Sequence, residues 1–134
     1  MNNASFSRKA EPFQLSQVRL HEGIFKDRQE IHARYLMMID PDRMAAPFRL
    51  QAGLAPKAEL YGGWESRDIS GHTLGHYLSA LCFHDASSGD ERARERIDYI
   101  VDELAACQQA NGDGYVLPVD KQAVEDLRGG NDSR

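Results

Sequence analysis

The residue types best suited to chemistry gather between positions 62 and 80. The run Gly62-Gly63-Trp64-Glu65 comes first, Asp68 follows, and the segment 71–80 contains His72 and His76. Residues four positions apart lie one turn apart on the same face of a helix. If this segment is helical, the two imidazoles stand side by side, where they can ligate a metal or bond to hydroxyl groups.

The spacing of the two histidines does not by itself decide between those roles. In the H-E-x-x-H zinc helix, a glutamate between the histidines acts as general base, whereas here Thr73, Leu74 and Gly75 intervene. Near the start of a helix the dipole disfavours a protonated imidazole, so His72 is suited to bond to a hydroxyl group. Two structural hydrogen-bonding groups that tie a loop to the helix are an equally good interpretation.

Other residues of this cluster also have two interpretations. Trp64 offers either a platform for a sugar ring or an anchor in a hydrophobic core, and for a lone tryptophan the core is favoured. Glu65 and Asp68 form a candidate carboxylate pair, because glycoside hydrolysis needs two acids that flank the bond. Such acids more often cap helices or accept hydrogen bonds from loop amides, and this interpretation is favoured. Gly75 costs about 1 kcal/mol relative to alanine inside a helix, which predicts a close approach by another helix or a ligand.

Hydrophobic periodicity predicts three helices around the cluster. The first covers about residues 25–39 and ends at Asp40-Pro41, since proline disfavours helical geometry in the residue before it. The second starts at an N-cap, Ser70, and runs to about residue 86, and the third covers about residues 91–110. The apolar faces expected to be buried are Ile24, Ile31, Tyr35, Met38 and Ile39 in the first helix, Leu74, Tyr77, Leu78, Leu81 and Cys82 in the second, and Ala93, Ile97, Ile100, Val101, Leu104 and Ala105 in the third.

The segments between and beyond these helices are irregular. Residues 13–18 partly alternate in polarity, which predicts a short extended segment. Residues 43–70 contain prolines and glycines that interrupt every period, yet they remain too apolar for a linker, so we expect a long ordered loop of the kind that often carries function. Residues 121–127 are expected to form one or two helical turns. Residues 1–11 are typical of a disordered lead-in, and 129–134 of a frayed end.

Composition excludes several classes of protein. A net charge of −5 and a pI near 5.5 argue against a nucleic-acid partner, for which a basic patch is expected. No segment approaches the roughly 18 apolar residues that span a bilayer, and the N-terminus lacks the apolar core of a secretory signal, so the sequence predicts a cytoplasmic protein with no membrane partner. Cys82 and Cys107 form no C-x-x-C pair and are expected to be small buried hydrophobic residues.

Several motifs occur together in the order found in one enzyme family. They are Pro12-Phe13-Gln14-Leu15-Ser16-Gln17-Val18-Arg19-Leu20, Arg34-Tyr35-Leu36, Leu54-Ala55-Pro56-Lys57-Ala58, Tyr61-Gly62-Gly63-Trp64-Glu65, Gly71-His72-Thr73-Leu74-Gly75-His76-Tyr77-Leu78-Ser79-Ala80, Tyr99-Ile100-Val101-Asp102-Glu103-Leu104 and Asn111-Gly112-Asp113-Gly114-Tyr115. Over about residues 12–118 the chain resembles the N-terminal part of the β-L-arabinofuranosidase-type glycoside hydrolases, glycoside hydrolase family 127 and relatives.

The resemblance implies an all-α fold, an incomplete (α/α)6 toroid made of its first few helices and a long ordered loop. Residues 12–118 would be the N-terminal portion of the catalytic domain, and 119–134 a divergent or truncated tail. It also implies retaining hydrolysis of terminal β-L-arabinofuranosides. A histidine of the G-H-x-x-G-H-Y motif lies in the family's sugar pocket, so His72 and His76 inherit a substrate-contact role, and which of the two makes the contact stays open. Trp64 and Glu65 complete the expected substrate-binding residues.

The family's nucleophile is a cysteine held at a zinc site of three cysteines and one glutamate, and those motifs lie downstream in its members. Because Cys82 and Cys107 match none of them, we expect no catalytic residue and no cofactor within this chain. An N-terminal segment that is inactive by itself is therefore predicted, with a carbohydrate substrate and the rest of the barrel as partners. The alternatives are a small helical interaction module and a metal-binding protein that uses His72 and His76 with Glu65 or Asp68.

Overall fold

The computed structural model describes residues 10–66 and 70–130 and shows a helical bundle. Its elements are the 3-10 turn Leu15–Gln17, α1 (Ile24–Met38), α2 (Pro41–Gln51), the 3-10 turn Gly63–Ser66, α3 (His72–Ser88), α4 (Glu91–Asn111) and α5 (Lys121–Arg128). The described residues contain no strand, which confirms the all-α class. Most of the expected lead-in and the last four residues of the expected frayed end lie outside the described ranges.

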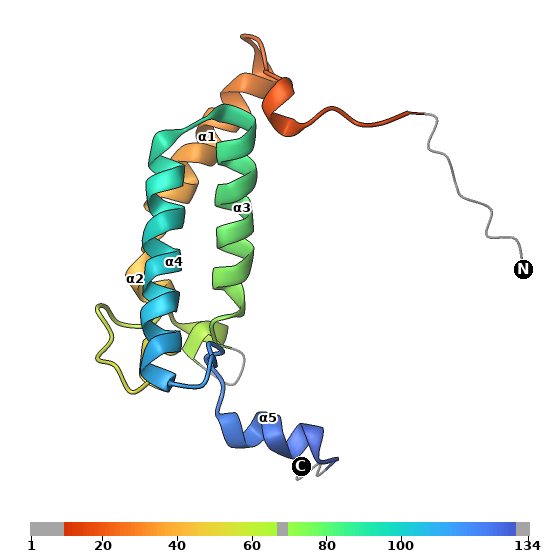
Figure 1. Ribbon diagram of the computed structural model, residues 1–134. Coiled ribbons are helices and arrows are strands. Elements are labelled where there is room, and N and C mark those ends of the chain that lie inside the picture. Colours follow the sequence, from red (N-terminus) through yellow and green to blue (C-terminus); the bar gives the residue numbers. More distant parts are fainter. Residues whose placement is uncertain (1–9, 67–69, 131–134) are drawn as a thin grey trace, which may run out of the picture.

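The helices α3 and α4 form an antiparallel hairpin, with α1 and α2 packed behind it (Figure 1). Gly89 ends α3 in the left-handed conformation, with a φ of 74°, and Asp90 begins α4 by accepting a hydrogen bond from the amide of Arg92. Glycine adopts this conformation without the steric cost that other residues carry. The short stop-and-cap sequence therefore reverses the chain and lays α4 alongside α3.

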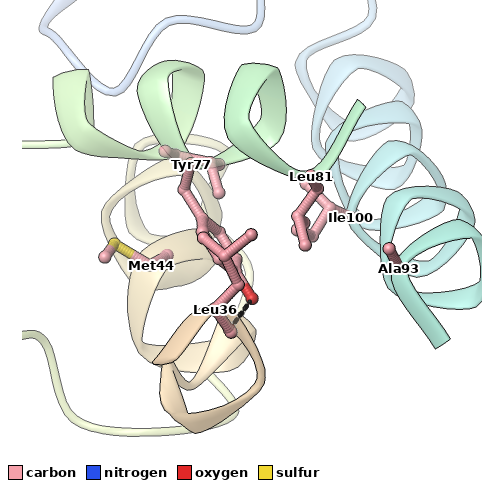
Figure 2. Close-up of a cluster of buried hydrophobic side chains, with 7 residues drawn as sticks. Leu36, Met44, Tyr77, Leu81, Ala93 and Ile100 are labelled. Atoms are coloured by element: carbon pink, nitrogen blue, oxygen red, sulfur yellow. Dashed lines mark hydrogen bonds between the residues drawn. The ribbon is translucent and has the colours of Figure 1, made fainter. Parts of the chain in front are cut away.

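One hydrophobic core joins the four long helices (Figure 2). Its buried side chains are Leu36 of α1, Met44 of α2, Leu74, Tyr77 and Leu81 of α3, and Ala93 and Ile100 of α4. The hydroxyl of Tyr77 donates a hydrogen bond to the carbonyl oxygen of Leu36 at 2.8 Å and accepts one from Arg96 at 3.1 Å. A buried phenol needs such partners, so these bonds fix how α1 and α4 meet α3. Among the described residues, no helix combines the length and apolar character needed to cross a bilayer.

The long-loop prediction for residues 43–70 is wrong in its first part, because residues up to Gln51 continue α2. Asp40 caps α2 with its side chain and Pro41 occupies its first turn, a position proline tolerates well. Pro47 lies inside the helix and is buried, so packing of this face outweighs the backbone penalty of an internal proline.

The remainder of that segment is a loop that the body of the protein holds in place. Arg43 donates hydrogen bonds to the carbonyl oxygens of Glu59 and Leu60. Lys57 and Arg49 both pair with the buried carboxylate of Glu103 on α4, at 2.6 and 2.8 Å. Residues 52–66 are thus ordered by side-chain bonds to their backbone and by one shared carboxylate.

Several sequence-based expectations about faces and short segments are corrected by the structure. Leu15–Gln17 forms a 3-10 turn in place of the extended segment, because no neighbouring strand is present among the described residues and Gln17 bonds back to the amide of Gln14. On α1 the expected buried face is largely exposed, with Tyr35 60% and Met38 80% exposed, and the helix instead buries Ala33 and Leu36. On α3 Cys82 is exposed, and on α4 Val101 and Ala105 are exposed.

Candidate functional site

The start of α3 is organised by a carboxylate that comes from the preceding loop. The 3-10 turn Gly63–Ser66 places Glu65 beneath the helix N-terminus. Its Oε2 accepts a hydrogen bond from the amide of Gly71 at 2.6 Å, and its Oε1 accepts from the amide of Thr73 at 3.3 Å and from the Thr73 hydroxyl. Free amides and the helix dipole both favour negative charge at this position. The interpretation of Glu65 as a capping acid is confirmed, and the N-cap residue is Gly71, not Ser70 as predicted.

The protonation of Glu65 follows from these contacts. Burial raises the pKa of this carboxyl, whereas the hydrogen bonds from Thr73 and from the Gly71 amide, together with nearby His72, lower it, and the net pKa lies below the ordinary value. Glu65 is therefore a carboxylate at neutral pH. A general acid for glycosidic bond cleavage needs a raised pKa, so the structure gives Glu65 a role other than proton donation.

The two histidines lie together on the exposed face of α3. The rings of His72 and His76 meet edge to face, with centroids 5.9 Å apart and planes at 86°. The Nδ1 atom of His72 lies 3.4 Å from Oε1 of Glu65, and the His72 side chain is 45% exposed. The expected one-turn spacing of two imidazoles on one helical face is thus present. Both side chains are exposed to solvent.

One prediction about this cluster is wrong. Trp64 is 68% exposed, so it is no core anchor. A methyl group added at Gly75 would meet no described atom within 4 Å, so no described helix approaches this glycine closely, and the approach of a ligand stays a prediction. The exposed indole and the space at Gly75 leave an open surface around the histidines. Asp68, the second acid of the predicted carboxylate pair, lies outside the described residues.

A largely apolar hollow of about 490 Å³ lies beside His72, between α3 and α4. Gly71, His72 and Gly75 line one side, while Leu104 lies on α4 and Leu117 and Pro118 belong to the segment that follows α4. Gly71 has a φ of 85°, and a Cβ atom there would overlap Pro118 and lie 2.8 Å from Phe48 Cε2. Only glycine lets these two rings pack so closely on the start of α3.

Local sequence patterns give no signal for the partners of Glu65. Thr73 lies eight positions from Glu65 along the chain, and local spacing does not predict a bond between them. The carboxylate of Glu103 gives no such signal either, because its partners Arg49 and Lys57 lie far away in the sequence.

The described residues do not fit the zinc site implied by the family resemblance. That site needs three cysteines, and the sequence has two, Cys82 and Cys107. Cys82 is exposed on α3, whereas Cys107 is buried on α4, where burial raises the pKa of its thiol. Across residues 10–66 and 70–130, no three histidine, cysteine or acidic side chains are grouped so that they could hold a metal ion. The histidine-based metal site is therefore unsupported among these residues.

Comparison with known proteins identifies the family to which this helical chain belongs. The chain has no match among curated proteins. A family model described as the catalytic domain of β-L-arabinofuranosidase, glycoside hydrolase family 127, matches residues 17–133. This match spans α1 to α5 and includes Trp64, Glu65 and both histidines of α3. The chain belongs to the β-L-arabinofuranosidase family of glycoside hydrolases, family 127.

Proposed function

We propose that this chain supplies one wall of the sugar-binding pocket of a glycoside hydrolase that acts on β-L-arabinofuranosides or related glycans. The observation that carries the proposal is the exposed pair His72 and His76 on α3, one of them backed by the buried carboxylate of Glu65. Imidazole nitrogens donate and accept hydrogen bonds, which suits the ring hydroxyls of a furanoside.

Trp64 extends the proposed binding surface. Its indole is exposed and stands next to Glu65 in the turn Gly63–Ser66. Exposed indole faces bind apolar faces of ligands at little cost in conformational entropy. Trp64 is the stacking group in this proposal, and the histidines are the hydroxyl-binding groups.

In this proposal another part of the enzyme supplies the catalytic nucleophile. Glu65 is committed to Gly71 and Thr73, and neither Cys82 nor Cys107 lies in a group of metal-binding side chains among the described residues. The two consecutive helix pairs, α1 with α2 and α3 with α4, are the opening of an incomplete (α/α)6 toroid. In that arrangement further helices cover exposed apolar side chains such as Tyr35 and Met38 of α1. The 134-residue chain is therefore inactive by itself.

The exposed apolar side of α1 also favours a second candidate, a helical interaction module. An apolar surface of this kind marks binding sites for other proteins. In that case the 134-residue chain is monodisperse and stable alone, and it binds no arabinofuranoside.

The deciding experiment is an assay with a chromogenic β-L-arabinofuranoside in the presence of zinc and a reductant. The 134-residue chain is compared with a chain extended through the coding sequence after Arg134. Activity only in the extended chain is expected, and there His72→Ala and His76→Ala should lower kcat/KM while the exposed His32→Ala serves as matched control. Activity of the short chain would contradict the placement of the nucleophile. Inactivity of both chains would overturn the substrate assignment.

A further inference from the structure

The apolar hollow beside His72 is formed by parts of four elements of the chain. Its larger apolar side chains come from α2, α3, α4 and the segment after α4, and they include Phe48, Leu74, Leu78, Leu104 and Leu117. Leu74 is buried, whereas the other four keep part of their surface exposed to solvent. Exposed apolar surface in a concave site is stabilised when an apolar group covers it and displaces water.

The lining determines the kind of ligand that fits. The hollow has a volume of about 490 Å³, which is within the range of roughly 300–1,000 Å³ typical of small-molecule sites. None of the described residues that line it is Asp, Glu, Lys or Arg, and its polar side chains, Ser70 and His72, both lie near the start of α3. A sugar buried in such a lining would leave hydroxyl groups without hydrogen bonds. The hollow therefore fits an apolar group whose polar end lies beside the start of α3.

Gly75 provides space for such a group on α3. It lines the hollow and is exposed, and a Cβ atom there would meet no described atom within 4 Å. Glycine disfavours a helix interior, which predicts the approach of another helix or a ligand, and no described helix comes close. Close packing of Pro118 on Gly71 holds the segment after α4 beside this space. The walls around Gly75 are therefore in place before a ligand binds.

We propose that this hollow binds the apolar aglycone of a β-L-arabinofuranoside, an alkyl or aryl group joined to the sugar through the glycosidic oxygen. His72 lines the hollow and also belongs to the face that is proposed to bind the sugar, so the two sites are continuous at this residue. The hollow then selects among substrates by their leaving group and takes no part in bond cleavage. The link to a sugar rests on the proposed function, whereas binding of an apolar group between α3 and α4 does not.

The length of an alkyl aglycone tests the proposal. Methyl, butyl and hexyl β-L-arabinofuranosides are titrated into the 134-residue chain by isothermal titration calorimetry. Affinity should rise about twofold to fourfold for each methylene that enters the hollow, and the heat capacity of binding should become more negative as the alkyl chain lengthens. Equal affinity for the methyl and hexyl glycosides would overturn the proposal and leave the proposed function standing.

Gly75→Leu fills the hollow from one wall, and Ala106→Leu is its matched control. Ala106 is exposed on α4 and does not line the hollow. Both changes add the same side chain to a helix, but only Gly75→Leu should abolish the dependence of affinity on alkyl length. Leu117→Asn, at an exposed position of the lining, should weaken binding of the hexyl glycoside more than that of the methyl glycoside. A length dependence that persists in Gly75→Leu would overturn the proposal, because the alkyl chain then binds elsewhere.

Three further results distinguish this inference from other uses of the hollow. If hexan-1-ol binds the unmodified chain but not Gly75→Leu, and none of the glycosides binds, the apolar site is confirmed, and both the link to a sugar and the proposed function are refuted. A chain that sediments as a dimer and becomes monomeric in Gly75→Leu would assign the hollow to a second copy and overturn the proposal. In the chain extended after Arg134, kcat/KM should favour the hexyl over the methyl glycoside. Equal values there would mean that a later helix fills the hollow, which also overturns the proposal.

Discussion

Two glycines near the start of α3 provide a matched pair for testing the packing of the site. Gly71 adopts a φ of 85°, and a Cβ atom there would overlap Pro118 and press on Phe48. Gly75 lies one turn later inside the helix, and a Cβ atom there would meet no described atom within 4 Å. The same change, glycine to alanine, should therefore have opposite effects at the two positions.

The magnitudes follow from these local environments. In Gly71→Ala the left-handed conformation costs roughly 1–2 kcal/mol, and overpacking against the proline and phenylalanine rings adds about 1–3 kcal/mol. The expected loss in the free energy of unfolding is therefore about 2–5 kcal/mol. In Gly75→Ala the helix gains about 1 kcal/mol, because alanine loses less backbone entropy than glycine on folding.

Urea denaturation followed by far-UV circular dichroism measures both effects in the 134-residue chain. The midpoint should fall for Gly71→Ala and rise for Gly75→Ala, with the slope unchanged in both variants. A Gly71→Ala variant as stable as the unmodified protein would refute the packing of Pro118 on the start of α3. A destabilised Gly75→Ala variant would show that another part of the protein occupies this face.

Three further predictions concern the core and the charges that hold it. Cys82 should react with a thiol reagent at least about 100-fold faster than Cys107, because the buried thiol has a raised pKa and needs local opening; equal labelling rates by mass spectrometry would contradict this. Tyr77→Phe should cost about 1–2 kcal/mol in urea denaturation, because the buried carbonyl oxygen of Leu36 loses its donor; unchanged stability would count against this bond. Glu103→Gln should cost roughly 2 kcal/mol at pH 7. Burial raises the pKa of the Glu103 carboxyl, but its two cationic partners lower it by more, so the net pKa lies below the ordinary value. The stabilisation that Glu103 contributes to the folded protein is therefore fully present above about pH 4.3 and is lost as the pH falls through the lower folded-state pKa. A Glu103→Gln variant whose stability keeps the full dependence on acid pH would contradict this assignment.

Helix positions could be inferred from the sequence where a clear stop or cap stands at each end. The third predicted helix matches α4 to within one residue, because Asp90 and Gly112 bound it. The sequence pattern predicts a loop where α2 lies, although Asp40-Pro41 is both a stop for one helix and a good start for the next. Pro47 is the reason, because an internal proline normally argues against a helix. Burial of that segment against α4 is a tertiary effect that local patterns do not contain.

The faces of the helices were harder to infer than their positions. On α1 the larger apolar side chains, such as Tyr35 and Met38, are exposed, and the smaller Ala33 lies in the contact with the rest of the bundle. Periodicity shows that an apolar stripe exists, but the choice between two stripes depends on which neighbour packs closest. Small residues permit that close approach, so side-chain size misleads when it is used alone.

One part of the candidate site could be predicted from the local sequence pattern, and another part depends on tertiary contacts. The juxtaposition of His72 and His76 follows from helical spacing alone and was predictable. The contacts of Glu65 join residues six and eight positions apart, which local spacing does not predict, yet this carboxylate both starts α3 and lies beside His72. Loss of Glu65 would therefore weaken the start of the helix and remove the negative charge beside the ring at once. A variant such as Thr73→Val, which weakens the cap and spares the charge, separates these two effects.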